Sequence, residues 1–375
     1  MKILGIETSC DETAIAVLDI EENENGTTVK ILANEILSQI ELHRPYGGVF
    51  PNLAKREHEK NLEPILQKAL GAATEIEDGS LVRFAKTTRS PSSISSAAEN
   101  HAAIGAIAVT QGPGLEPCLW TGINFAKTLA EKWKVPVIPT NHMEGHIVAS
   151  LLKKEGENYS FAIPEFPSLA LLISGGHTEI VLMREFGKYE IVGKTRDDAV
   201  GECFDKTARL LGLPYPGGPE ISKLAAEARK ENLKLETELP RPMLDADNLD
   251  FSFSGLKTAV LYATKDKKLS ADDIKKFARE IEEAITDVLI GKMEKAIEKY
   301  SAESLIAGGG VIANTFIRSA LQKLADSYDI PLYLPHTSHA TDNALMIALA
   351  GYFKIRRGGG TNEKDFGAEG NMNLD

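Results

Sequence analysis

The sequence predicts an α/β protein built from two related domains that face a cleft. Apolar strands alternate with helices along the chain, and one strand–turn–strand design occurs twice. The first copy, residues 2–19, reads KILGIETSCDETAIAVLD, and the second, residues 168–184, reads SLALLISGGHTEIVLMR. Small or hydroxyl residues lie between the two apolar strands of each copy, which indicates a distant internal duplication, with a chance pair of hairpins as the alternative. Such turns expose backbone N–H groups that can line a phosphate.

Three later junctions place glycine between an apolar strand or turn and a helix. Gly112 and Gly114 follow a strand near 104–109 and precede a helix that ends near Trp133. The segment YPGGP, residues 215–219, predicts a tight turn before a helix, and the glycines of residues 308–310 follow a strand at 304–307. This arrangement places a phosphate or ribose at a helix N-terminus, although a glycine after a strand is often only a turn.

Two segments lack this regular alternation, and they help to set the predicted domain boundaries. Residues 73–101 are rich in Ser, Thr and Ala without a sustained period, which predicts a long mobile loop. Residues 358–375, GGGTNEKDFGAEGNMNLD, predict a disordered tail. We expect the first domain to span 1–135 together with about 336–357, and the second domain to span 136–335.

Composition limits the class of protein. The 375 residues are 43% apolar and 26% charged, which is ordinary for a globular protein with real cores. The net charge of −12 argues against a general nucleic-acid binder. It does not exclude RNA, because local basic patches can bind phosphate on an acidic protein. The basic clusters at 54–60 and 265–268 are more commonly solvated surface.

The N-terminus and the cysteines indicate a cytoplasmic protein. MKILGIETSC lacks the apolar core of a signal peptide and an Arg-rich presequence, and no apolar run approaches the length of a membrane span. Cys10, Cys118 and Cys203 are too scattered for a disulfide framework or a cysteine metal site. We therefore expect structural thiols in a reducing compartment, with a reactive Cys10 as the less favoured alternative.

The segment TNHMEGHIVASLL, residues 140–152, contains a pair of histidines that can bind a metal ion. His142 and His146 lie four residues apart on an expected helix, so they share one face about one turn apart. Half-buried, hydrogen-bonded histidines are the structural alternative. The protease pattern HExxH does not fit, because Glu144 lies about 200° round the helix from His142. A third protein ligand must come from elsewhere in the chain.

Eight motifs, in order along nearly the whole chain, carry a family resemblance. The chain resembles the bacterial-type tRNA N6-adenosine threonylcarbamoyltransferases, formerly called O-sialoglycoprotein endopeptidases. The loop at 73–101 and the tail lie outside the resemblance. The motifs are ETSCDET (7–13), YGGVFPNLAKREHEKNLEPIL (46–66), HMEGH (142–146), LLISGGHTE (171–179), DDAVGECFDKTARLLGLPYPGGP (197–219), FSFSGLKT (251–258), GGGVIAN (308–314) and TDNALMIA (341–348).

The resemblance implies an actin-like, sugar-kinase-like fold with a nucleotide in the cleft, and it supplies the missing metal ligand. One ion, Fe²⁺ or Zn²⁺, is expected on His142, His146 and Asp342, with the metal-binding helix in the second domain. Two imidazoles and a carboxylate suit either ion and leave positions for substrate oxygens. His177, His336 and His339 are competitors by residue type and are left outside the site.

The resemblance also implies nucleotide contacts in the second domain. The backbone of Leu172, Ile173, Ser174, Gly175 and Gly176 is expected to face the phosphate. Asp205 and Gly218 are expected on the ribose and base side, and Asn314 at the adenosine moiety. A carboxylate suits ribose hydroxyls, and glycine permits close backbone approach. Mg²⁺ with ATP is a further ligand of this cleft. FSFSGLKT is expected to shape the cleft and to contact RNA nearby.

The implied reaction transfers a threonylcarbamoyl group from threonylcarbamoyl-adenylate to N6 of the adenosine 3′ of the anticodon, forming t6A in tRNAs that read A-starting codons. That amine is a poor nucleophile, because its lone pair is delocalised into the ring. Asp11 and Glu12 lie in the first turn, where a carboxylate can accept the amine proton. We favour Asp11 for this role, and a turn-capping role for it is the alternative.

The implied partners are tRNA, a shortened and catalytically inactive paralog, and a small P-loop ATPase, with a homodimer as the alternative and no membrane. Two departures from the family pattern lie near the Gly-Pro-Gly-Leu region, where family members tend to meet partner proteins: WTGINFAK at 120–127 replaces the usual VGLSFAK type, and the loop at 73–101 is an addition. An ATP-dependent kinase or ATPase of the same fold is the rival function, and a catalytically silent assembly subunit is a third. The HxxxH pair and the late aspartate favour the transferase, because phosphoryl transfer normally uses Mg²⁺ bridged by phosphates.

Overall fold

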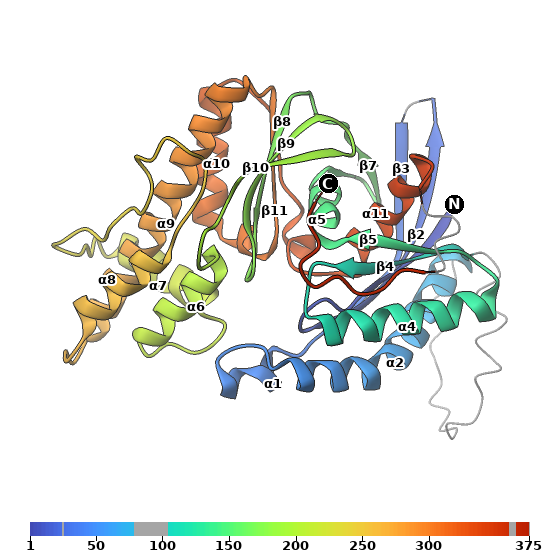
Figure 1. The fold of residues 1–375 in the computed structure, drawn as a ribbon, viewed down its shortest axis with the longest axis horizontal. Helices are drawn as coiled ribbons and strands as arrows, with labels where there is room; N and C mark the ends of the chain where they lie inside the picture. Colours follow the sequence, from blue (N-terminus) through green and yellow to red (C-terminus); the bar gives the residue numbers. More distant parts are fainter. Residues whose placement is uncertain (25, 79–103, 360–364, 375) are drawn as a thin grey trace. The chain divides into compact units, whose positions relative to one another are not determined.

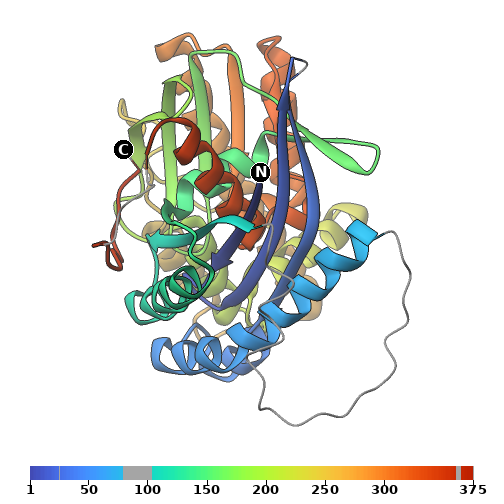
Figure 2. The same cartoon turned by 90° about the vertical axis from the view of Figure 1, so that its right-hand side faces the viewer.

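The computed structural model describes residues 1–24, 26–78, 104–359 and 365–374 (Figures 1 and 2). The chain divides into two compact units. Unit 1 comprises Met1–Gln39, Val49–Ala162 and Asp342–Asn373, and unit 2 comprises Ile40–Gly48, Ile163–Thr341 and Leu374–Asp375. Within the described residues, no helix is both long enough and apolar enough to cross a membrane.

Unit 1 contains a seven-stranded sheet in the order β5-β4-β1-β2-β3-β7-β6. β1 pairs antiparallel with β2 and parallel with β4, so the first hairpin lies in the middle of the sheet. The strands are β1 (Lys2–Glu7), β2 (Glu12–Asn23), β3 (Gly26–Ser38), β4 (Ile104–Gly112), β5 (Val137–Asn141), β6 (Leu152–Glu155) and β7 (Asn158–Phe161).

Alternate residues of β1 pack against different helices of unit 1. Leu4 and Ile6 join the apolar core with α2 and α4. Gly5 faces α11, and a Cβ at Gly5 would lie only 2.2 Å from the carbonyl oxygen of Ala344, so this strand position needs glycine. The helices of this unit are α2 (Pro51–Asp78), α4 (Glu116–Trp133), α5 (His142–Ser150) and α11 (Ala344–Arg356).

Unit 2 contains a five-stranded sheet in the order β10-β9-β8-β11-β12. Its helices bury one large apolar core with this sheet, centred on side chains such as Leu171 and Phe204. The strands are β8 (Ser168–Ile173), β9 (Thr178–Glu185), β10 (Lys188–Lys194), β11 (Ser304–Gly308) and β12 (Leu332–Tyr333). The helices are α1 (Ile40–His43), η1 (Arg44–Tyr46), α6 (Val200–Leu210), α7 (Gly217–Lys230), α8 (Ser254–Thr264), α9 (Ala271–Tyr300), η2 (Gly310–Ala313), α10 (Thr315–Ser327) and η3 (Thr337–His339).

The two sheets share one topology. In unit 1 the order β3-β2-β1-β4-β5 repeats the order β10-β9-β8-β11-β12 of unit 2. The directions also agree, because the first three strands of each series are antiparallel neighbours and the last three are parallel neighbours. The two predicted hairpins are β1–β2 and β8–β9. The α/β class and the internal duplication are therefore confirmed at the level of topology.

The observed boundary between the units differs from the predicted one at residue 135. Residues 137–162 belong to unit 1, because β5 extends the parallel part of its sheet beside β4 and α5 follows β5 directly. The helix with the two histidines is therefore part of the first unit, and its placement in the second domain is corrected. Residues 336–341 lie in unit 2, and the short segment 40–48 also belongs to unit 2.

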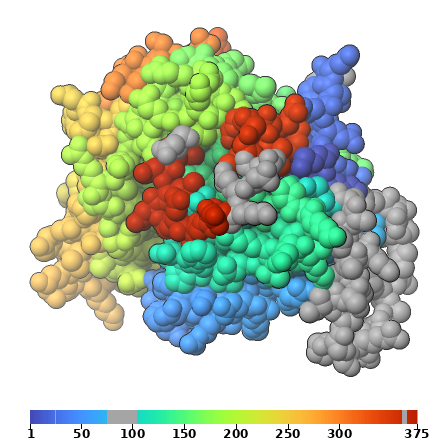
Figure 3. Space-filling model, turned by 45° about the vertical axis from the view of Figure 1, so that its right-hand side comes forward, coloured from blue at the N-terminus to red at the C-terminus, as the bar shows by residue number. Residues whose placement is uncertain are grey.

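The C-terminal segment contradicts the predicted disordered tail. Residues 365–373 belong to unit 1, and they are drawn in red in Figure 3 together with α11, whereas residues 360–364 and 375 of the predicted tail lie outside the described residues. The amide of Glu369 donates to Gln111 O at 2.9 Å, and Gly114 N donates to Gly370 O at 3.0 Å. A Cβ at Gly112 would lie 2.0 Å from Glu369 O. The composition of the tail is polar and glycine-rich, but its backbone hydrogen bonds to residues 111–114 fix it in place.

The predicted loop at 73–101 starts too early. Helix α2 continues to Asp78, so residues 73–78 are helical. The remainder of the predicted loop, from residue 79 onward, lies outside the described residues.

Candidate metal centre and nucleotide-contact residues

Helix α5 presents the two histidines from a well-defined start. Asn141 ends β5 and caps α5, since its Oδ1 accepts hydrogen bonds from Met143 N at 2.8 Å and Glu144 N at 3.3 Å. His142 and His146 then lie one turn apart, and both side chains are buried. Their rings meet edge to face with centroids 4.8 Å apart. The predicted shared face is therefore confirmed.

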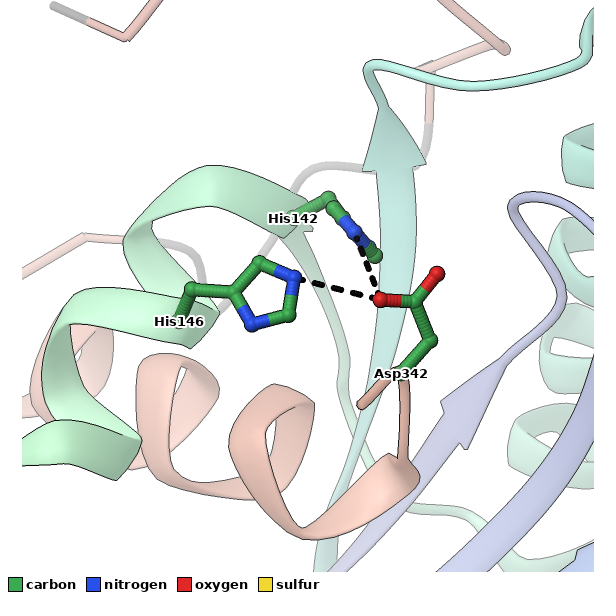
Figure 4. Close-up of side chains that lie close together, drawn as sticks. All are labelled: His142, His146 and Asp342. Carbon is green, nitrogen blue, oxygen red and sulfur yellow. Dashed lines mark ion pairs between the residues drawn. The ribbon is translucent and has the colours of Figure 1, made fainter. Parts of the chain in front are cut away.

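Asp342 reaches the histidines because it lies just before α11, which packs against α5. Its Oδ1 lies 3.2 Å from His146 Nε2 and 3.5 Å from His142 Nε2 (Figure 4). One ligand atom from each of the three residues lies within 4.8 Å of the others. Among the described residues, these three are the one set of His, Cys, Asp or Glu side chains whose ligand atoms lie close enough together to hold a metal ion.

Glu7, at the end of β1, orients His142 from the opposite side. Its Oε2 lies 3.2 Å from His142 Nδ1 and accepts a hydrogen bond from Thr110 Oγ1 at 2.6 Å. Ser9 Oγ lies 3.3 Å from the same Nδ1. A carboxylate accepts hydrogen bonds, so in the neutral ring Nδ1 carries the proton and Nε2 keeps its lone pair toward Asp342. The sequence prediction missed Glu7. The available signal was a glutamate at the end of an otherwise apolar strand.

The charges around His142 shift the pKa values of the group. Burial lowers the pKa of His142, but the carboxylates of Asp342 and Glu7 outweigh burial and hold that pKa well above the ordinary value. Burial lowers the pKa of His146, and the neighbouring His142 lowers it further. Burial alone would raise the pKa of Asp342, yet His142 and His146 hold it far below the ordinary value. The site thus pairs an ionised carboxylate with two close imidazoles.

These residues fit a divalent metal ion. The set of two imidazole nitrogens and one carboxylate oxygen suits Fe²⁺ or Zn²⁺ and leaves coordination positions open. His146 Nε2 is buried, and although Asp342 Oδ1 lies 3.2 Å away, this atom has no hydrogen bond of good geometry within the described residues. A buried polar atom without such a bond is costly, and a metal ion at this point satisfies it. The charged second layer that Glu7 provides is also typical of metal-bound histidine.

Asp11 and Glu12 lie beside this group in unit 1, in the turn between β1 and β2 and at the start of β2. Burial raises the pKa of Glu12 well above its ordinary value, and the carboxylates of Asp11 and Asp342 raise it further. The hydroxyl of Ser38 donates to Glu12 Oε1 at 3.2 Å. The charges of Asp11 and Asp342 thus disfavour the ionised form of Glu12.

In unit 2, the predicted phosphate contacts lie at the end of β8 and in the following turn. Leu172 and Ile173 are buried strand residues, and the strand ends before Ser174. The Ser174 hydroxyl accepts a hydrogen bond from His177 N at 3.1 Å, which closes the turn. Side chains added at Gly175 or Gly176 would meet nothing within 4 Å, so this backbone is open to close approach.

The N-terminus of α6 packs directly on that turn. Gly201 N donates to Ser174 O at 3.1 Å, and a Cβ at Gly201 would lie 2.7 Å from the same oxygen. Asp205 follows one turn later on α6, and its Oδ1 accepts a hydrogen bond from Gly217 N at 2.6 Å. Burial raises the pKa of Asp205, while the Gly217 and Gly218 amides oppose that rise. Asp205 and Gly218, predicted as a pair, are therefore neighbours.

Asp205 also lines a hollow of about 510 Å³. Arg44 and Arg209 border this hollow, and Arg44 Nε donates to Tyr215 O at 3.0 Å. Arg209 Nη2 contacts Gly47 O. The hollow has the size of a small-ligand site. Its border carries two positive guanidinium groups, from Arg44 and Arg209, and the carboxyl group of Asp205.

Asn314 caps α10, which the sequence prediction did not anticipate. Its Oδ1 accepts hydrogen bonds from Phe316 N at 2.9 Å and Ile317 N at 3.0 Å. Its Nδ2 donates to Glu282 Oε1 at 2.6 Å, and this fully buried carboxylate also accepts from Arg229 Nη1 at 2.6 Å. The Asn314 side chain is therefore held rigidly beside the glycine loop at the end of β11.

The other titratable candidates do not join the metal group. His336 and His339 form a ring pair with centroids 5.7 Å apart, and His336 Nδ1 lies 2.7 Å from Ser338 Oγ. The three cysteines are free thiols. Burial raises the pKa of Cys118 and that of Cys203 to about 12, and burial with the nearby Asp11 raises the pKa of Cys10 well above its ordinary value. These thiols stay protonated, as expected of structural cysteines.

The duplicated topology defines the class: this is an actin-like, sugar-kinase-like α/β protein, and its first unit carries a histidine–aspartate group suited to a metal ion. One solved structure, T. kodakarensis HypF, matches with a TM-score of 0.54 at 12% identity, covering 96% of this chain and 48% of that chain, which supports the fold alone. The model of the family TsaD, tRNA N6-adenosine threonylcarbamoyltransferase, matches residues 30–88 and 92–349.

Curated relatives agree with the family match. The tRNA N6-adenosine threonylcarbamoyltransferase of Bacillus cereus is 42% identical over 359 residues, which cover 95% of this chain and 92% of the relative. The protein of the same name from Bacillus thuringiensis is 41% identical over the same length. The chain therefore belongs to the TsaD family of tRNA N6-adenosine threonylcarbamoyltransferases.

Proposed function

We propose that this chain transfers the threonylcarbamoyl group from threonylcarbamoyl-adenylate to N6 of the adenosine 3′ of the anticodon in tRNAs that read A-starting codons, forming t6A. The observation that carries the proposal is the group of buried His142 and His146 with the partly exposed Asp342, in a chain of this family. A kinase of the same fold normally binds Mg²⁺ through substrate phosphates and needs no such group.

His142, His146 and Asp342 would hold one divalent ion, Fe²⁺ or Zn²⁺. When bound, such an ion supplies Lewis-acid polarisation of a carbamoyl oxygen. Glu7 serves this site by accepting a hydrogen bond from Nδ1–H of His142, and this bond directs Nε2 toward Asp342. Both histidine ligands are buried, and Asp342 keeps about a fifth of its side chain exposed, so the group is reached from the Asp342 side.

Asp11 is the proposed proton acceptor. The N6 amine attacks the carbamoyl carbon, the new N–C bond forms, and the C–O bond to the adenylate phosphate breaks. AMP leaves as an anion and needs no proton at neutral pH, so the one proton to be moved is that of the attacking amine. Burial and the carboxylates of Asp11 and Asp342 raise the pKa of Glu12, which favours its neutral form. It therefore leaves the role of base to its neighbour.

Unit 2 supplies the proposed adenylate contacts. The open backbone at Gly175 and Gly176 suits a phosphate, and the Asp205 carboxylate beside Gly218 suits ribose hydroxyls. Asn314 is proposed at the adenosine moiety, where one hydrogen of its Nδ2 already bonds Glu282. ATP with Mg²⁺ is a second ligand that these contacts would accept.

The proposed partners are tRNA, a shortened inactive paralog and a small P-loop ATPase, with a homodimer as the alternative assembly. A tRNA-modifying activity of this kind belongs in the cytoplasm, which is the compartment we propose.

The test is nucleoside mass spectrometry of unmodified tRNA after incubation with the protein, Fe²⁺ or Zn²⁺, preformed threonylcarbamoyl-adenylate and the two partner proteins. We expect t6A with the wild type and none with Asp342→Ala. His336→Ala, which removes a histidine outside the site, is the matched control and should keep the activity. An absence of product in the complete mixture would refute the proposed function.

A further inference from the structure

The turn between β1 and β2, which carries Asp11 and Glu12, is held by its surroundings. Leu115 N donates to Ser9 O at 2.7 Å, so the turn is tied to the start of α4. Gln39 N donates to Asp11 O at 2.9 Å, which ties it to the end of β3. These bonds fix the backbone just before the carboxylate pair and at its first member.

One buried side chain bonds both flanks of the carboxylate pair. His58 lies on α2, within the basic segment AKREHEK, and its side chain is fully buried. Its Nε2 lies 2.9 Å from the carbonyl oxygen of Cys10, the residue before Asp11. Its Nδ1 lies 2.8 Å from Oγ1 of Thr13, the residue after Glu12. His58 therefore spans the four-residue segment that holds both carboxylates.

The partners of His58 define its tautomer. A carbonyl oxygen only accepts, so the ring must donate its Nε2 proton to Cys10 O. Nδ1 is then the acceptor for the Thr13 hydroxyl, and Gln39 Nε2 lies 3.4 Å from the same nitrogen. The Gln39 amide also donates to Ala54 O at 3.3 Å, which ties this cluster to α2. A neutral ring with the proton on Nε2 satisfies both flanks at once.

We propose that His58 is a positioning residue that sets the place of the Asp11 and Glu12 carboxylates for proton transfer. The inference rests on the proposed function. The carboxylates interact electrostatically with each other and with Asp342, so a small movement of the turn changes their mutual distances. Misplacement of a reacting group by about 1 Å can cost about 100-fold in rate. His58 acts only through the turn, since its ring bonds the flanking residues.

Three variants separate the bond to Cys10 O from general packing. His58→Gln places an amide N–H near the Nε2 position and keeps the donor to the carbonyl. His58→Asn places its amide near the Nδ1 position and loses that donor. His58→Ala removes both bonds and leaves the Cys10 carbonyl and the Thr13 hydroxyl without the ring. The pair Gln and Asn thus compares two amides of the same chemistry at the two ring positions.

The measurements are kcat and KM for t6A formation in the complete mixture, adenylate affinity, metal content and the melting temperature. We expect His58→Ala and His58→Asn to lower kcat roughly tenfold or more, with KM for the adenylate, its affinity and the metal content unchanged. His58→Gln should recover most of kcat. Equal kcat in all variants, or losses that follow the melting temperature and metal content with no recovery by Gln, would overturn the proposal.

A second measurement does not depend on t6A formation. Two-bond ¹H–¹⁵N spectra of ¹⁵N-histidine-labelled protein, assigned by the signals lost in His58→Gln, report the tautomer of His58. We expect the neutral ring with the proton on Nε2. A proton on Nδ1, or a charged ring, would overturn the arrangement even if the wild type forms t6A. A wild type that forms no t6A would refute the proposed function instead, while this spectrum still decides the arrangement.

Discussion

Glu7 Oε2 lies 3.2 Å from Nδ1 of His142, on the opposite side of the ring from Asp342. The strand end thereby holds a metal-site histidine in one tautomer and one orientation. Thr110 Oγ1 and Ser9 N hold the two oxygens of Glu7 in turn. The site therefore has a rigid second layer that joins β1, β4 and α5.

Glu7→Gln should weaken metal binding while preserving the fold. The amide has the shape of the carboxylate but lacks its charge, and loss of such a second-layer partner typically costs about 10- to 100-fold in metal affinity. Competition with a coloured chelator measures this affinity. Glu59→Gln, on the exposed face of α2, is the control and should bind metal as the wild type does. Wild-type affinity in Glu7→Gln would remove the orienting role.

Metal affinity should rise with pH over a range above the ordinary histidine pKa of about 6.5. Without metal, the raised pKa of His142 favours the protonated ring between Glu7 and Asp342, so a bound ion competes with that proton. The stability that this charged ring contributes is full below the unfolded pKa and is lost as pH rises through the raised folded pKa. Calorimetry in buffers of different ionisation enthalpy should report proton release on metal binding. The same heat in all buffers at neutral pH would contradict this prediction.

Asp197 links two motifs that lie far apart in the sequence. Its Oδ1 accepts from Phe253 N at 2.8 Å and from Ser254 N at 3.2 Å, and its Oδ2 accepts from the hydroxyls of Ser252 and Ser254 at 2.5 and 2.6 Å. The carboxylate thus fixes the start of α8 and the FSFSG segment. Burial raises its pKa, but these hydrogen bonds outweigh burial and lower it overall.

Asp197→Asn should lower the free energy of unfolding at neutral pH by about 1 kcal/mol, a modest value because the side chain is solvent-exposed. The folded pKa is depressed, so this stabilisation is present above the unfolded pKa of about 3.9 and is lost as pH falls through the lower folded value. Urea unfolding at neutral pH and near pH 3 measures the difference. Asp247→Asn, an exposed control, should change neither value. A difference that persisted in acid would exclude the charge as its origin.

Deletion of the segment after Gly359 should destabilise unit 1. Phe366 and Ala368 pack against its core, and Lys127 Nζ donates to Phe366 O at 2.7 Å. Phe366 is partly buried, so its packing is worth less than the about 1.5–3 kcal/mol of complete burial, and a drop in melting temperature of roughly 2–4 °C is expected. Calorimetry of the truncated chain gives this value.

A single substitution at Gly112, in the loop that contacts the C-terminal segment, tests the same point without a truncation. Gly112→Ala places a Cβ where Glu369 O lies and should displace the segment, whereas a Cβ at Gly48 meets nothing within 4 Å. Gly48→Ala is therefore the matched control and should melt as the wild type does. A truncated chain and a Gly112→Ala variant that both melt as the wild type would show that the segment adds no stability.

Local patterns predicted the hairpins, the glycine junctions and the histidine pair, because each depends on neighbours within a few residues. The third ligand, Asp342, was predicted only from the family resemblance. It lies 196 positions after His146, and no local sequence period joins the two. Glu7 and His58 were missed because their roles arise from strand and helix packing. The tail was mispredicted for the same reason: its order comes from backbone bonds to residues 111–114, which its own composition does not reveal.

The two neighbouring carboxylates of the first turn should respond differently to the same chemical change. Burial, Asp11 and Asp342 raise the pKa of Glu12, which favours the neutral acid, and a glutamine resembles that form in shape and charge. Glu12→Gln should therefore keep t6A formation within about threefold, which is small beside the roughly 100-fold or larger effect expected for a general base.

Asp11→Asn replaces the proposed proton acceptor by a group that cannot accept the amine proton. We expect kcat to fall by about 100-fold or more while adenylate affinity and metal content stay unchanged. Single-turnover t6A formation, read by nucleoside mass spectrometry beside adenylate calorimetry, separates the two effects. Glu12→Gln is the matched control, because it removes an acid from the adjacent position. If Glu12→Gln were the inactive variant and Asp11→Asn the active one, the base would be Glu12 and the proposed role of Asp11 would be wrong.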